Sequence, residues 1–289
     1  MSISAGVRPK SPTERMLAGN AWLVYAFFYA PILVLIVFSF NENNNVGIWT
    51  EPSLRWYRDV LANDAVMSAI RVSLIVAAIS TVVSTILGTM TALSLERFRY
   101  RGRRAFDGLV YLPIIIPDVT MAVMLLLFFA QSFQWLDAAL GWRPSFGIAT
   151  ISLSHIAFNI SFVAVVVRAR LGQLDARLEE AAADLYATRW QAFRRVTFPL
   201  IAPGVVGGAL LALTLSLDDV VVTSFVAGPG STTLPVYVFG LVRRGVTPLI
   251  NAVSTLMLVA SMVLIAISLG FQRTSRSRVA IREQELEPN

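Results

Sequence analysis

Three carboxylates stand inside long apolar segments, where a charged group needs either water or a partner. Asp118 follows Pro117 in one such segment, and Asp218 and Asp219 are neighbours in another. A carboxylate in hydrocarbon costs about 2.5–3.5 kcal/mol on insertion scales, so residues of this kind usually face an aqueous path or an opposite charge. Acidic groups with no buried lysine among them favour a route for a cationic solute. The alternative, which the sequence leaves open, is that they cap kinked helix ends or pair with an arginine: Arg71, Arg243 or Arg244.

The single histidine of the sequence, His155, has no carboxylate or cysteine at the spacing of a metal site. We therefore expect it to be packed and hydrogen-bonded within a helix bundle. The chain contains no cysteine, which excludes disulfides, zinc–thiolate sites and thiol nucleophiles. It also lacks a G-x-x-x-x-G-K-S/T run, so it has no phosphate-binding loop for ATP. The sequence predicts no catalytic residue, no metal and no cofactor, and energy for transport has to come from another chain or from an ion gradient.

Membrane-spanning helices are the elements that position these residues. The 289-residue chain is 56% hydrophobic and 15% charged, with a mean hydropathy of +0.66, whereas a soluble domain carries about 25% charged residues. A helix needs about 20 apolar residues to cross a bilayer, and barrel strands would instead alternate over about ten residues. We therefore predict an all-α polytopic membrane protein with six transmembrane helices. Their ranges are 21–40, 66–95, 106–133, 146–167, 201–226 and 248–271.

Basic residues give the orientation of the predicted helices. Most of the 24 lysine and arginine residues lie in the N-terminal tail, in the loops after the second and fourth helices, and in the C-terminal tail. The positive-inside rule places these segments in the cytoplasm. It also accounts for the net charge of +6, which is then no sign of a nucleic-acid partner. The predicted organisation is a cytoplasmic tail 1–20, a membrane domain 21–271 with a cytoplasmic loop 171–200, and a cytoplasmic tail 272–289.

The cytoplasmic loop is charged and amphipathic. Its alanines, the acidic pair Glu179 and Glu180 and its apolar spacing predict a short helix over 175–187. A second helix is predicted over 189–196, ending before Pro199. Such a loop either docks in a groove of a partner protein or lies on anionic membrane lipid. The alanines beside two glutamates favour protein docking, because acidic groups suit a lipid surface poorly.

The spacing within this loop resembles a motif of a known family. Glu180-Ala181-Ala182, a variable triplet, the position of Tyr186, nine residues and then Val196-Thr197-Phe198-Pro199 resemble the EAA loop of ABC-transporter permeases. In that family the loop forms coupling helices that sit in a cleft of the cytoplasmic ATPase. The resemblance implies an ATPase-coupling role for Glu179, Glu180, Ala181, Ala182, Asp184, Tyr186 and Pro199. The usual pattern has glycine at position 186, and since a tyrosine favours φ below zero, we expect the turn here to differ from the family's.

A second stretch narrows the resemblance. Leu217-Asp218-Asp219-Val220-Val221, followed by Gly228-Pro229-Gly230 and by Arg243-Arg244-Gly245-Val246-Thr247-Pro248, is similar to the spermidine/putrescine permease subunits. This similarity implies a type I ABC importer permease in a bacterial inner membrane, with both termini cytoplasmic. The implied partners are a second permease subunit, two cytoplasmic ATPase subunits and a periplasmic solute-binding protein. The implied substrate is a polyamine, drawn along a path that includes Asp118, Asp218 and Asp219.

Other functions remain open at this point. A permease of the same family for another small solute shares parts of these motifs. An ion-coupled carrier would show matching inverted halves, which the sequence does not reveal. A membrane enzyme would have to use Asp218, Asp219 and His155.

The predicted outer loops carry the remaining candidate surface. Segment 41–64 is polar and contains Trp49 and Trp56, typical either of an interfacial helix in an aromatic belt or of a surface for an external partner, here the binding protein. Between the last two predicted spans, 228–233 reads as a tight outer loop rich in turn residues.

Overall fold

The computed structural model describes residues 12–175, 177–245, 247–263 and 266, and these are almost entirely helical. Five helices of the described part are long and apolar enough to cross a membrane. These are α1 (Pro12–Ser39), α3 (Asp64–Arg97), α5 (Asp118–Leu140), α6 (Ile148–Leu171) and α9 (Phe198–Asp218). The shorter elements are α2 (Arg55–Ala62), α4 (Arg103–Ile115), α7 (Arg177–Asp184), α8 (Arg189–Ala192), the π-helical segment η1 (Phe193–Thr197), α10 (Val221–Val226), α11 (Leu234–Arg244) and an unlabelled helix over Pro248–Val263.

The third predicted span consists of two helices. We predicted one helix over 106–133, but α4 and α5 are separated at Ile116 and Pro117. Ile116 has the extended backbone (φ −69°, ψ 131°) that a following proline imposes. Pro113, in contrast, lies inside α4. The prediction of one continuous helix was wrong because both prolines sit in the same apolar run, and only the structure distinguishes the one that ends a helix.

The region after α9 also differs from the prediction. The fifth span was predicted as one helix over 201–226, whereas Asp219 and Val220 separate α9 from α10. The predicted outer loop 228–233 contains no helix, and it is followed by helix α11, where we predicted no element. The last predicted span, 248–271, is helical through Val263, and most of its remainder lies outside the described residues.

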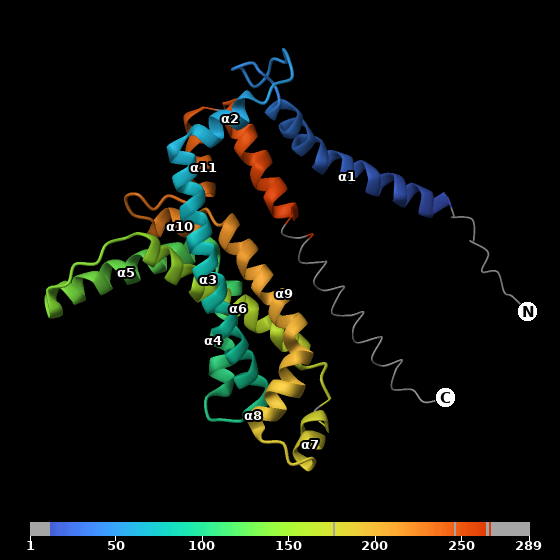
Figure 1. Cartoon of the computed structure of the whole chain (residues 1–289), viewed down its shortest axis with the longest axis vertical. Helices are drawn as coiled ribbons and strands as arrows, with labels where there is room; N and C mark the ends of the chain where they lie inside the picture. Colours follow the sequence, from blue (N-terminus) through green and yellow to red (C-terminus); the bar gives the residue numbers. More distant parts are fainter. Residues whose placement is uncertain (1–11, 176, 246, 264–265, 267–289) are drawn as a thin grey trace, which may run out of the picture.

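Helix α6 packs against both α3 and α9, and close glycine contacts set both crossings (Figure 1). A Cβ atom on Gly88 of α3 would lie 2.7 Å from Val163 Cβ and 2.9 Å from the carbonyl oxygen of Ile160. One on Gly208 of α9 would lie 3.2 Å from Val163 Cγ1. Small residues let helix backbones approach closely in a membrane, where no hydrophobic driving force brings helices together. The three helices therefore form a tight unit with Val163 at its centre.

An apolar cluster surrounds the break between α9 and α10. It combines side chains of α3, α5, α6 and α10: Val72, Val76, Ala122, Phe129, Ile151, Phe158, Val222 and Val226. Because these side chains are buried, the short helix α10 is fixed by packing as well as by hydrogen bonds. The break is thus part of the core.

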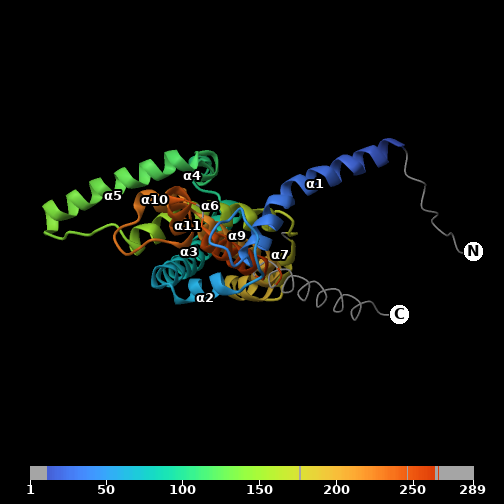
Figure 2. The same ribbon diagram turned by 90° about the horizontal axis from the view of Figure 1, so that it is seen from above.

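Two helices project from this core. Helix α1 extends away from it, and α5 extends away on another side (Figure 1 and Figure 2). The most apolar window of α1 is 0% buried and that of α5 is 11% buried, against 61% for α6. Such exposed apolar faces need lipid or another protein chain to cover them.

Candidate functional site

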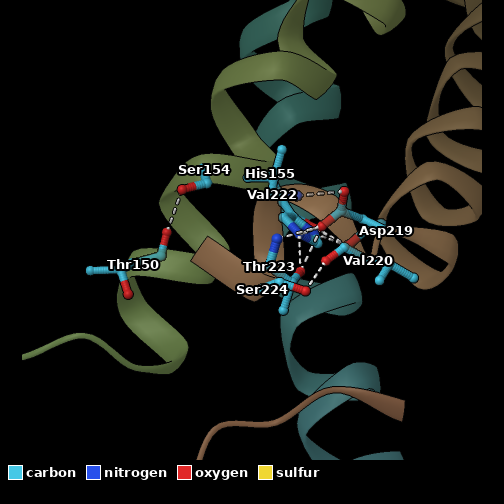
Figure 3. A network of polar contacts seen from close by, with 10 residues as sticks. Thr150, Ser154, His155, Asp219, Val220, Val222, Thr223 and Ser224 are labelled. Carbon is cyan, nitrogen blue, oxygen red and sulfur yellow. Dashed lines mark hydrogen bonds and ion pairs between the residues drawn. The ribbon is translucent and has the colours of Figure 1, made fainter. Parts of the chain in front are cut away.

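Polar residues at the break between α9 and α10 form one hydrogen-bonded network (Figure 3). The Asp219 carboxylate accepts from the backbone N–H of Val222 at 3.3 Å, and from both the N–H and the hydroxyl of Thr223 at 2.7 Å. It thereby serves the donors that the start of α10 leaves free, as a helix cap does. The side chain of Asp219 is 12% exposed. Asp219 therefore takes the capping position that the sequence left open as an alternative.

His155 connects this cap to the other central helices. The fully buried ring has Nε2 at 3.3 Å from Asp219 Oδ2 and at 3.0 Å from Thr223 Oγ1, and Nδ1 at 2.7 Å from Ser216 Oγ. Ser80 of α3 donates to Ser216 at 2.9 Å. Since an ionised carboxylate only accepts, the tautomer that satisfies Asp219 carries its proton on Nε2. His155 is packed and hydrogen-bonded as predicted, and its partner Asp219 lies 64 residues further along the chain, outside the reach of local spacing.

Asp218 lies in different surroundings from its neighbour. It is exposed and lines a cavity of about 560 Å³. Residues of α2, α3, α9, α11 and the helix Pro248–Val263 line this half-open cavity, and the lining is mainly aliphatic apart from Ser73, Thr214, Ser261 and Asp218. Small-molecule sites typically measure roughly 300–1,000 Å³ and combine apolar walls with a few polar groups. Asp218 is the ionisable group of this lining, and it forms no ion pair within the described residues.

The third carboxylate lies apart from this pair. Asp118 occupies the exposed first turn of α5, directly after the Pro117 break, and is not among the residues of the cavity wall. The guanidinium of Arg243 lies 4.6 Å from the ring centre of Phe239, and the described ion pairs connect none of the three aspartates to it or to Arg71. The sequence grouped three carboxylates, whereas the structure gives each of them a different environment.

The coupling loop contains two adjacent glutamates with different surroundings. Glu179 of α7 accepts from Arg97 Nη2 at 2.9 Å and from Thr197 Oγ1 at 2.6 Å. Glu180, the next residue, is exposed, and it makes none of the ion pairs found among the described residues. Asp184, at the end of α7, is exposed as well. One glutamate thus faces the protein itself and the other faces outward.

The turn after α7 has the geometry of a glycine C-cap. Tyr186 has φ of +60°, so the expectation of a negative φ was wrong. Its N–H donates to the carbonyl of Ala183 at 2.9 Å, and the N–H of Ala187 donates to that of Ala182 at 3.0 Å. This is the pair of hydrogen bonds of a Schellman motif, which compensates part of the steric cost of a left-handed tyrosine. The chain therefore makes with tyrosine the turn for which glycine is the usual residue.

The second short helix continues into α9, contrary to the predicted end before Pro199. Helix α8, η1 and α9 follow one another without a gap, and the N–H of Phe198 donates to the carbonyl of Phe193. In an α-helix a proline ring clashes with the carbonyl four residues earlier. A π-helical turn is wider, and it accommodates Pro199 in the first turn of α9.

Exposed apolar side chains gather on the same loop. Leu185, Tyr186 and Trp190 have 82%, 97% and 66% of their surface exposed. In the outer segment 41–64, in contrast, Trp56 points inward, because its Nε1 donates to the carbonyl of Asn41 at 2.8 Å. Trp49 remains 45% exposed and stacks edge-on against Phe38. Of the two tryptophans, Trp49 is the one that presents a free face.

Apolar helices around a solute-sized cavity, together with an exposed amphipathic loop, define a multi-pass helical membrane protein of the transport type. Residues 84–281 match the family of binding-protein-dependent transport system inner membrane components, and the chain belongs to this family. It is 47% identical to the putrescine transport system permease protein PotI of Escherichia coli, over 82% of this chain and 83% of that protein. It is 38% identical to the spermidine/putrescine transport system permease protein PotC of Haemophilus influenzae, over 88% of this chain and 96% of that protein.

Solved structures agree with the fold. A bacterial ABC transporter involved in the import of the acidic polysaccharide alginate aligns with a TM-score of 0.74 and 20% identity, covering 90% of this chain and 94% of that chain. The alginate transporter in complex with a periplasmic protein that holds an alginate pentasaccharide aligns with a TM-score of 0.71 and 20% identity, covering 92% and 93%. The predicted all-α polytopic fold of the ABC importer permease type is confirmed.

Proposed function

We propose that this chain is the permease subunit of an ATP-driven importer for polyamines, with putrescine as a substrate. The observation that carries the substrate class is Asp218, a free carboxylate on the wall of a mainly aliphatic cavity. Putrescine has an ammonium group at each end of a short methylene chain. One ammonium would meet Asp218 while the methylenes lie against the aliphatic wall. The similarity to permeases for putrescine and spermidine supports the same substrate class.

The three aspartates take different parts in this proposal. Asp218 contacts the solute in the cavity. Asp219 acts indirectly, because its oxygens are engaged by Thr223 and His155. These contacts maintain the interruption of the helix after Asp218. Asp118 stands on the exposed end of α5 and would meet the cation on another part of the path, in the assembled complex.

The exposed surfaces support the proposed energy source and the other proposed partners. Two cytoplasmic ATPase subunits would bind the assembled permease, and the loop 171–200 would dock one of them through Glu180, Asp184, Tyr186 and the alanine face of Ala181 and Ala182. Pro199 joins this loop to α9. A second permease subunit would cover the exposed apolar faces of α1 and α5, with lipid over the rest. A periplasmic binding protein would contact Trp49, while Trp56 holds the loop in shape. In this arrangement both termini lie in the bacterial cytoplasm, as the distribution of arginines favours.

Uptake by the reconstituted complex tests the proposal. We expect putrescine to accumulate in proteoliposomes only with ATP and the binding protein. We expect Asp218→Asn to raise the apparent KM about tenfold, equivalent to roughly 1.4 kcal/mol, without lowering the amount of folded complex. An unchanged KM would exclude Asp218 from the path.

A competition series identifies the solute. Unlabelled putrescine and spermidine should inhibit uptake of labelled putrescine. A putative 2-aminoethylphosphonate permease of Salmonella paratyphi A is 28% identical to this chain, so 2-aminoethylphosphonate is the informative competitor. Stronger competition by that zwitterion than by either polyamine would contradict the polyamine assignment while leaving the importer intact. Uptake driven by an ion gradient without ATP would contradict the importer itself.

A further inference from the structure

We propose that Glu179 transmits the movement of the coupling helix to the cavity, whereas its neighbour Glu180 docks the ATPase. This inference rests on the proposed function, since it needs an ATPase that moves α7. It divides two roles between adjacent residues of the same motif.

Glu179 lies at the junction of three elements. Its Oε1 accepts from Arg97, the last residue of α3, and from Thr197, the last residue of η1 before α9 begins. Its own backbone belongs to α7. One carboxylate therefore connects the coupling helix to the ends of two long helices. Figure 1 shows α7 and α8 together at the end of the molecule remote from α2.

The two helices joined at Glu179 also carry polar residues of the cavity wall. Ser73 lies on α3, about 36 Å from Arg97 at 1.5 Å per residue, and Asp218 ends α9 about 32 Å from Thr197. Between these ends, Ser80 of α3 donates to Ser216 of α9 at 2.9 Å. The helices are thus connected twice along their length. A displacement of α7 held by Glu179 would therefore move the parts of the cavity wall that α3 and α9 contribute.

The ion pair lies where such a contact can transmit force. The side chains of Arg97 and Glu179 are 25% and 34% exposed, so the pair is largely shielded from water. Thr197 is 4% exposed, so water has little access to compete with its contact to Glu179. Glu180 has no such intramolecular contact in the described ion pairs and is left to a partner. The role of transmitting movement therefore belongs to Glu179, and the role of docking the ATPase belongs to Glu180.

Matched variants test the assignment. Thr197→Val removes the hydroxyl that contacts Glu179, and Thr197→Ser keeps it. Glu179→Gln removes the charge opposite Arg97. Glu96→Gln is a control on the same helix end, since Glu96 pairs with Arg168 of α6 at 3.0 Å and leaves α7 untouched. Each variant is assembled with the ATPases, the second permease and the binding protein in proteoliposomes. The quantities measured are ATPase recovered with the permease, and putrescine imported per ATP hydrolysed.

We expect Glu179→Gln and Thr197→Val to retain the full amount of ATPase and to import at least threefold less putrescine per ATP. Thr197→Ser and Glu96→Gln should keep the wild-type ratio. Loss of the ATPase from Glu179→Gln would overturn the inference, because Glu179 would then be a docking residue. If Glu179→Gln does not fold, the Thr197 pair decides, and equal ratios for valine and serine overturn the inference. A wild-type complex without ATP-driven uptake would refute the proposed function itself, whereas normal wild-type coupling with unchanged variants refutes only the role of Glu179.

Discussion

Replacing Tyr186 by glycine should change two measurable properties in opposite directions. Tyr186 is left-handed (φ +60°), which costs an L-residue about 1–2 kcal/mol. Glycine removes that cost but loses about 0.5–1 kcal/mol more conformational entropy on folding. Tyr186 as a whole is 97% exposed, so removal of its side chain sacrifices almost no packing within this chain. The net gain is about 0.5–1 kcal/mol, or a two- to fivefold decrease in opening of the turn.

Hydrogen exchange measures this local opening directly. The reporting amides are those of residue 186 and of Ala187, which bond to the carbonyls of Ala183 and Ala182. After correction for intrinsic rates, we expect two- to fivefold greater protection in Tyr186→Gly. Tyr186→Ala, which keeps the left-handed strain without the ring, should match the wild type.

Binding of the ATPase gives the opposite result. Both variants remove an exposed aromatic side chain from the proposed docking surface, and truncation of such a contact costs more than about 1 kcal/mol at an interface centre. We therefore expect ATPase affinity to fall about fivefold in Tyr186→Gly and in Tyr186→Ala alike. Lower protection in the glycine variant, or equal gains in both variants, would refute the left-handed turn. Unchanged affinity in both would remove Tyr186 from the docking surface.

Two further substitutions test the packing of the core and its polar network. Gly88→Ala should destabilise the protein by about 1–3 kcal/mol, because the new Cβ overlaps Val163. The control Gly108→Ala places its Cβ in open space and should be neutral or stabilising. Equal denaturation midpoints for the two variants would contradict the close crossing of α3 and α6. Asp219→Ala should cost about 2–4 kcal/mol, since it removes the acceptor of the Val222 and Thr223 N–H groups and of the Thr223 hydroxyl, together with one of the two contacts of His155 Nε2. An unchanged midpoint for unfolding in detergent would show that the network does not hold the break.

Most of the helical framework could be predicted from the sequence, because long apolar runs have no stable alternative to a helix in lipid. The interruptions within those runs could not. Pro113 and Pro117 stand in the same apolar context, yet one lies inside α4 and the other separates α4 from α5. Asp219 separates α9 from α10 through hydrogen bonds to Thr223 and His155. The contact with His155 depends on how α6 packs against this break. Breaks of this kind depend on tertiary contacts that no local pattern records.

The candidate site was predictable in part for the same reason. The acidic residues could be predicted as site residues because charge is rare in apolar segments. Their type and spacing do not distinguish Asp218, which lines the cavity, from Asp219, which caps α10. The loop motif identified Glu179 and Glu180 together. The contacts of Glu179 with Arg97, at the end of α3, and with Thr197 distinguish them. Contacts between helices assign these roles, and they lie beyond local sequence spacing.

The π-helical turn at Phe193–Thr197 sets the rotational phase between α8 and α9. A turn of this kind contains one residue more than an α-helical turn, and one residue corresponds to about 100° of rotation about the helix axis. Deleting a single residue there would leave α9 in place and turn Trp190 to another side of the same axis. The direction in which the loop faces its partner can therefore change through a one-residue insertion or deletion, without any alteration of the membrane-embedded helices.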